Sequence, residues 1–131
     1  MLRVLYMQKG DFNTILQMRP LAMLDWLLDN FNTEIPETIV SIEDMKNASA
    51  VLLKLSGYYS YLMSLLAYAK VKTRQEKKLS TKDNKESYED MVDRRDILQN
   101  YTDIVKQNYS AVSRAVTIYI ENNNELKMGR G

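Results

Sequence analysis

Neighbouring carboxylates are the residues of this sequence best suited to chemistry, since acid–base catalysis and binding of hard cations both use such pairs. The pairs are Glu43/Asp44, Glu89/Asp90 and Asp93/Asp96. Each is flanked by Lys or Arg at helical spacing, as Asp90 is by Arg94. That pattern is typical of exposed or interfacial ion pairs, which we expect here in place of a catalytic site.

The side-chain inventory excludes most other chemistry. The chain of 131 residues has no His and no Cys, so it lacks imidazole bases, thiolate nucleophiles, disulfides and the usual ligands of zinc, copper and haem. No Gly-rich phosphate loop, nucleophile elbow or metal-ligand spacing occurs either. We expect no catalytic residue, no metal, no cofactor and no small-molecule substrate. A protein that acts by binding, and not an enzyme, is predicted.

Basic residues are concentrated between positions 70 and 82. This segment contains six basic residues and one acidic residue, so its net charge is +5, whereas the net charge of the whole chain is +1. They are Lys70, Lys72, Arg74, Lys77, Lys78 and Lys82. One interpretation is a solvated helix end, because cations near a helix C-terminus gain from the macrodipole. The other is contact with nucleic-acid phosphates, which is salt-sensitive and independent of sequence.

Tyrosines precede this basic stretch. Tyr68 lies just before Lys70, and Tyr58, Tyr59 and Tyr61 lie upstream, so stacking of unpaired bases on these rings is conceivable. A place in the core or a subunit interface is the simpler expectation.

Two long helices must position these residues. Ser41-Ile-Glu-Asp44 has the form of a capping box and predicts a helix over about 42–78. Its apolar or small residues recur at alternating spacings of three and four. They are Met45, Ala48, Leu52, Leu55, Tyr59, Leu62, Leu66 and Ala69. The pattern stops there, so this helix has an apolar body and a basic tail.

A second long helix is predicted over about 88–121, behind a polar loop at 80–86. Ser87-Tyr-Glu-Asp90 repeats the capping-box form. Two heptad rows follow, Ile97, Ile104, Ala111, Ile118 and Leu98, Val105, Val112, Tyr119. This apolar side is wider than a two-stranded seam needs, so contact with more than one neighbour is expected. We expect fraying through residues 122–124 and a flexible tail at 127–131.

Residues 1–40 indicate two short helices, over about 12–18 and 20–31, with Pro20 in the first turn of the second. The chain is predicted to be one all-α domain over 1–131, in which these helices pack against the antiparallel hairpin of residues 41–126. At ~1.5 Å per residue the first long helix reaches roughly 55 Å, too long to be covered by this chain alone. A homo-oligomer is therefore expected, with an interface at Leu55, Tyr59, Leu62, Leu66, Leu98, Val105 and Val112.

The apolar run at residues 1–7 is too short for a signal-peptide core and lacks a small-residue cleavage site. No stretch approaches the ~20 apolar residues of a membrane span. A cytoplasmic location without a membrane partner is expected.

Three segments carry a resemblance to a known family. They are Leu65-Leu-Ala-Tyr-Ala-Lys-Val-Lys-Thr-Arg74, Asp93-Arg-Arg-Asp-Ile-Leu98 and Ser113-Arg-Ala-Val-Thr-Ile118, with the polar loop after the first. Together they make residues 41–126 resemble the UvsY-type recombination mediators of tailed phages, which are small all-helical proteins. Residues 1–40, with Trp26, do not fit this pattern.

The resemblance implies an oligomer that binds single-stranded DNA and helps to load a recombinase onto DNA covered by single-strand-binding protein. It implies that Lys70, Lys72 and Arg74 contact the DNA, and that the protein works in the cytoplasm of an infected or lysogenic bacterial host. The alternative is a small anti-defence inhibitor, similar to anti-CRISPR proteins, that docks on a host nuclease through its Tyr- and Met-rich face. A structural adaptor that only oligomerises is a third possibility.

Overall fold

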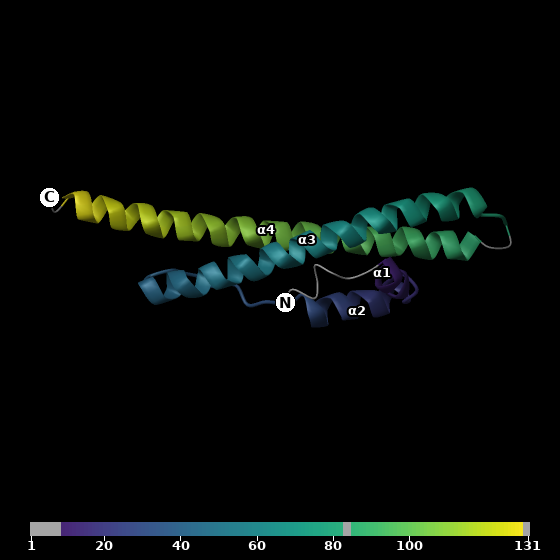
Figure 1. Ribbon diagram of the computed structural model, residues 1–131, viewed down its shortest axis with the longest axis horizontal. Coiled ribbons are helices and arrows are strands. Elements are labelled where there is room, and N and C mark those ends of the chain that lie inside the picture. The colour runs from purple at the N-terminus through teal and green to yellow at the C-terminus, as the bar shows by residue number, and fades with distance from the viewer. Residues whose placement is uncertain (1–8, 83–84, 130–131) are drawn as a thin grey trace.

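The computed structural model describes residues 9–82 and 85–129, and these fold into helices joined by short connections without a strand. In chain order the helices are α1 (Lys9–Ile15), α2 (Pro20–Asn30), α3 (Ile42–Leu79) and α4 (Lys85–Gly129). α3 and α4 run antiparallel as a long hairpin, and α1 and α2 lie along one side of it (Figure 1). The predicted all-α fold and helical hairpin are confirmed. The apolar run at residues 1–7 lies outside the described residues.

The start of α3 follows the predicted capping box. Ser41 is the extended N-cap, and its hydroxyl accepts a hydrogen bond of 3.1 Å from the backbone N–H of Asp44. The Asp44 carboxylate in turn accepts from the backbone N–H of Val40 at 3.1 Å. Both bonds satisfy donors that a helix N-terminus leaves without partners. The pair Glu43/Asp44 therefore belongs to the first turn of a helix.

The predicted start of the second long helix is wrong. α4 begins at Lys85, so Ser87 lies inside the helix and is not its N-cap. Its hydroxyl donates across the hairpin to Glu76 Oε2 at 3.2 Å. The predicted fraying at residues 122–124 is also wrong, because α4 continues to Gly129. Its last turns extend beyond the start of α3 (Figure 1).

The core lies between α3 and α4. The α4 row of Leu98, Val105 and Val112 is at most 2 % exposed and belongs to one core cluster with Leu62, Leu65 and Leu66 of α3, which are equally buried. Burial of such side chains is worth roughly 1.5–3 kcal/mol each and holds the hairpin together. The parallel row on α4 differs, because Ile104 and Ile118 are about half exposed.

This burial corrects the predicted oligomer interface. Leu55, Leu62, Leu66, Leu98, Val105 and Val112 form the core of the single chain and have no surface left for a second subunit. Tyr59 alone of that set is half-buried. A heptad row indicates burial but does not say whether the covering helix belongs to the same chain, so the spacing alone could not distinguish a core from a subunit interface.

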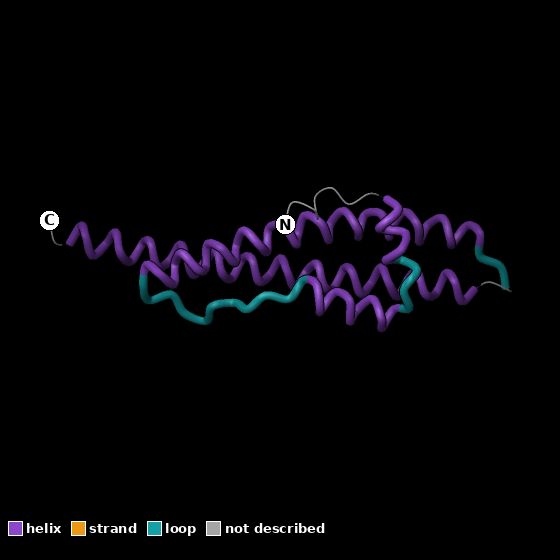
Figure 2. Tube along the Cα trace, turned by 60° about the horizontal axis from the view of Figure 1, so that its bottom comes forward, coloured by secondary structure: helices purple, strands orange, loops and turns teal. Residues whose placement is uncertain are grey.

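An aromatic cluster attaches α1 and α2 to α3. The Phe31 ring stacks on Tyr61 with centroids 5.3 Å apart, and it meets Trp26 and Tyr58 edge-on. Phe12 of α1 meets the edge of the same Tyr61 at 5.6 Å. Such contacts add to the burial of the rings. The predicted packing of the short helices against the hairpin is confirmed (Figure 2). Pro20 begins α2 as expected.

By length and composition α3 meets the criterion for a membrane-spanning helix, with a window of mean hydropathy 1.2. Core helices of soluble proteins meet the same criterion. In this fold the central leucines and Tyr61 of α3 pack against the other helices.

Candidate nucleic-acid interface

The C-terminal third of α3 carries a row of cations on its outer surface. Lys70, Arg74, Lys77 and Lys78 are all exposed, and spacings of four, seven and eight residues place them on one helix face. We call these four residues the basic stripe. At 1.5 Å per residue it extends along the helix for about 12 Å.

No described carboxylate neutralises the basic stripe. The ion pairs within the described residues join Lys85 to Glu89 at 3.7 Å and Arg95 to Asp96 at 3.1 Å, and both lie on α4. Lys77 and Lys78 also lie in the last turn of α3, where the helix dipole favours positive charge. The dipole does not account for Lys70 and Arg74, which lie further from the helix end.

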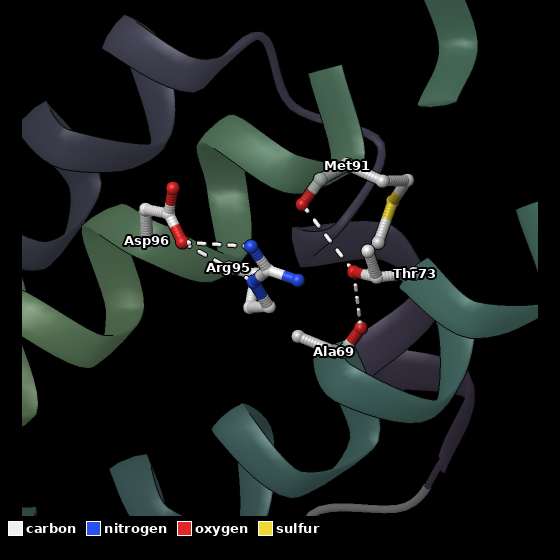
Figure 3. A network of polar contacts seen from close by, with 5 residues as sticks. All are labelled: Ala69, Thr73, Met91, Arg95 and Asp96. Carbon is white, nitrogen blue, oxygen red and sulfur yellow. Dashed lines mark hydrogen bonds and ion pairs between the residues drawn. The ribbon is translucent and has the colours of Figure 1, made fainter. Parts of the chain in front are cut away.

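The face of α3 beside the basic stripe is packed against α4 at this level. Thr73 is buried, and its hydroxyl donates to the Ala69 carbonyl at 2.7 Å while lying 3.5 Å from the Met91 carbonyl of α4 (Figure 3). The small Ala69 is fully buried beside it. The part of α3 that carries the basic stripe is therefore packed against α4, which fixes the backbone positions of the four residues.

Lys72 lies apart from the stripe, on the side of α3 that faces α1 and α4. It is half-buried, and its Nζ lies 5.6 Å from the centroid of the Tyr68 ring, a cation–π distance. It lines a hollow of about 300 Å³, which we call the Lys72 hollow. The hollow is lined by Asn13, Leu16, Gln17, Lys72, Glu76, Ser87, Met91 and Arg94.

Arg94 is a second cation of this hollow that the sequence analysis missed. Its Nε donates a hydrogen bond of 2.6 Å to the Met18 carbonyl, and its terminal nitrogen lies 3.2 Å from the Met91 sulfur. The expected ion pair with Asp90 or Asp93 is absent from the described structure, whereas Arg95 does pair with Asp96. The Asp-Arg-Arg-Asp segment was the available signal, but it does not reveal that Arg94 turns toward α1 and α2.

Glu76 is the carboxylate of the Lys72 hollow, and it accepts the hydrogen bond from Ser87. With Lys72 and Arg94 the hollow therefore carries a net charge of +1, and the side-chain amides of Asn13 and Gln17 provide further donors. Lys82 is exposed in the loop between α3 and α4. The predicted basic residues thus divide into the stripe, the hollow and the loop.

The tyrosines upstream contribute to packing. Tyr61 is 3 % exposed and cannot stack on a base in this structure, and Tyr68 is half-buried with its hydroxyl donating to Asn13 Oδ1 at 2.6 Å. Burial, and secondarily the Asp11 carboxylate, raises the pKa of Tyr61. Base stacking on Tyr61 is therefore excluded, and the cations dominate this surface.

Comparison with protein-family models, with curated proteins and with solved structures finds no match for this chain. Within the described residues no group of three or more His, Cys, Asp or Glu side chains is placed to hold a metal ion. Function must therefore be argued from the basic stripe and the Lys72 hollow.

Proposed function

We propose that this protein binds single-stranded DNA through the basic stripe, as a homo-oligomer that acts as a recombination mediator. The observation that carries the proposal is a set of cations on one exposed helix face, without carboxylate partners among the described residues and beside a packed core. Each phosphate that such a cation neutralises releases a counterion, which favours binding of any sequence.

The Lys72 hollow supports the proposal. It brings Lys72 and Arg94, from different helices, to one concave site at the same end of the hairpin. A backbone lying along the stripe would extend past the loop cation Lys82, and the hollow offers donors for a phosphate or a base edge. The binding is electrostatic, so its affinity falls with salt, with a slope of about −0.7 per phosphate for single strands.

The test compares two pairs of substitutions that change net charge equally. Lys70→Ala with Lys77→Ala removes half of the stripe, whereas Lys46→Ala with Lys54→Ala removes two lysines from the other end of α3. Fluorescence anisotropy with a labelled single-stranded oligonucleotide is measured across a salt series. We expect the stripe variant to lose affinity and its salt slope to flatten by about 1.4. The control variant keeps both.

Absence of binding by the unmodified chain at low salt would refute the proposal, as would equal losses in the two variants. Mediator activity is then tested by whether the protein speeds recombinase assembly on DNA covered by single-strand-binding protein. DNA binding without faster recombinase assembly would indicate a DNA-binding protein that is not a mediator.

The anti-defence alternative gains less from the structure. It requires a Tyr- and Met-rich docking face, but Tyr58, Tyr61 and Tyr68 pack against Phe12 or Phe31. Of the residues that such a face would use, Met63 on α3 is exposed and would be available to a partner. The same anisotropy experiment discriminates, because an inhibitor that acts through protein contact needs no affinity for DNA.

A further inference from the structure

α4 carries a second apolar row on the side that α3 does not cover. Ile104 is 51 % exposed and Ile118 49 % exposed, with the exposed Ala111 between them at heptad spacing. We call Ile104, Ala111 and Ile118 the outer row; Ile97, one heptad earlier, is partly buried against the core. Half-exposed isoleucines at regular spacing along a helix are typical of a surface that another helix covers.

A shallow hollow of about 470 Å³ runs beside the outer row. It is lined entirely by α4, namely by Asp103, Lys106, Gln107, Ser110, Ala111 and Arg114, which are all exposed. Because the side chains of Ser110 and Ala111 are small, the middle of this surface forms a shallow depression. A second helix can approach closely over small residues, at the short end of the usual interaxial range.

Opposite charges bound the two ends of the hollow. Asp103 and Arg114 are eleven residues apart, which is about three turns, so they lie on the same helix face roughly 16 Å from each other. Gln99 Nε2 donates to Asp103 Oδ1 at 3.2 Å, which leaves Oδ2 for another donor. Arg114 has no ion-pair partner within the described residues.

We propose that the occupant of this surface is a second copy of the chain, whose α4 runs antiparallel across the hollow about a two-fold axis. An axis midway between Gln107 and Ser110 places each Asp103 beside the partner subunit's Arg114, so the ion pair forms twice. The same axis places Gln107 opposite the partner's Ser110. Ile104 then lies within about 3 Å, measured along the helix, of the level of the partner's Ala111.

The charge pattern selects this arrangement over others. A parallel pair would place Asp103 beside the partner's Asp103 and Arg114 beside the partner's Arg114, and such contacts are unfavourable. The antiparallel pair is isologous, so it closes at two subunits and leaves no unsatisfied copy of the surface. The proposed dimer depends on the part of the proposed function that makes the protein a homo-oligomer. It does not depend on the contact with DNA.

The test is a charge exchange followed by measurement of mass in solution. Sedimentation equilibrium at micromolar concentration is performed on the full chain, on Asp103→Arg, on Arg114→Asp and on the double variant. We expect a dimer for the unmodified chain and dimerisation weakened by at least about tenfold in each single variant, because like charges then meet twice. The double variant restores the opposite pairing and the dimer. Circular dichroism verifies that every variant remains helical.

A monomeric unmodified chain overturns the inference. A dimer or larger assembly whose mass is unchanged by either single substitution also overturns it. Failure of the double variant to recover also overturns it, because two-fold pairing of these residues requires recovery. Binding of a short oligonucleotide that reaches a single basic stripe is measured in parallel. The single variants should keep it, so loss of the dimer and loss of the DNA contact are distinguishable.

Discussion

The Arg94 Nε donates a 2.6 Å hydrogen bond to the Met18 carbonyl. Met18 lies in the connection between α1 and α2, so this bond ties the N-terminal helices to α4. The guanidinium is half-buried, and it lines the Lys72 hollow at the same time. One side chain therefore both attaches the short helices and contributes charge to the candidate DNA site.

Arg94→Ala should lower the free energy of unfolding by about 1–3 kcal/mol, because a hydrogen bond from a charged donor to a partly buried carbonyl is lost. Arg95→Ala is the control at the neighbouring position. Its pair with Asp96 is exposed, so its loss should cost at most about 0.5–1 kcal/mol. Urea denaturation followed by circular dichroism measures both. Equal losses would show that the bond to Met18 contributes nothing particular.

Leu62→Ala should lower the free energy of unfolding by about 2–5 kcal/mol, because Leu62 is fully buried and its truncation leaves a cavity between α3 and α4. Leu53→Ala makes the same change in the same helix, but Leu53 is 69 % exposed. That control should stay within about 0.5 kcal/mol. If Leu62 instead formed a subunit interface, its truncation would change the mass in solution and leave a folded monomer of undiminished stability.

Tyr61→Phe should raise the free energy of unfolding by about 1 kcal/mol. The Tyr61 Oη is buried without a hydrogen-bond partner in the described structure, and an unsatisfied buried hydroxyl is costly. Thermal unfolding at neutral pH measures the effect. A loss of stability would mean that this hydroxyl does make a stabilising bond.

The same substitution has a pH signature. Burial raises the pKa of Tyr61 in the folded chain, and the Asp11 carboxylate adds to this effect. The unfolded chain therefore releases the phenolic proton first, above about pH 10, and stability falls as the pH rises further. Phe has no proton to release, so the stability of Tyr61→Phe does not fall in this way. The difference in free energy of unfolding between Tyr61→Phe and the unmodified chain should therefore widen above about pH 10. An advantage independent of pH would contradict the raised pKa.

The sequence predicted those features that depend on local chemistry. Ser41 and Asp44 cap α3 as expected, since a capping box needs only neighbouring residues. Ser87 has the same pattern, but it lies within the first turn of α4, and its hydroxyl bonds to Glu76 across the hairpin. Tertiary contacts thus override a cap signal where the helix can start earlier.

The candidate site was only partly predictable for a related reason. Helical spacing alone places Lys70, Arg74 and Lys77 on one face. It cannot reveal that Arg94 joins Lys72, because the partner of Arg94 is a backbone carbonyl of a distant segment. Nor can it separate the buried row of Val105 from the outer row of Ile104, since both have the same period.

Glu76→Gln should strengthen binding of single-stranded DNA by a few fold at low salt. Its carboxylate lies in the Lys72 hollow and opposes phosphate there, whereas the amide keeps an acceptor for Ser87. Glu43→Gln makes the same charge change at the far end of α3 and is the control. Anisotropy titrations should show the gain for Glu76 and its decline as salt screens the charge. An equal gain in both variants would indicate a general effect of net charge.

The length of the oligonucleotide should matter if the dimer and the DNA contact are both correct. Antiparallel pairing of α4 places the hairpin loops at opposite ends of the dimer, with the two basic stripes roughly 55 Å apart by the rise of the helix. A strand long enough to reach both stripes gains effective concentration for its second contact, which can raise affinity by about 10²-fold or more. Anisotropy with a series of oligonucleotides should therefore show a rise in affinity at one length in the unmodified chain. Asp103→Arg should remove that rise and keep the affinity for short strands, whereas a rise that persists in Asp103→Arg would place the second contact elsewhere.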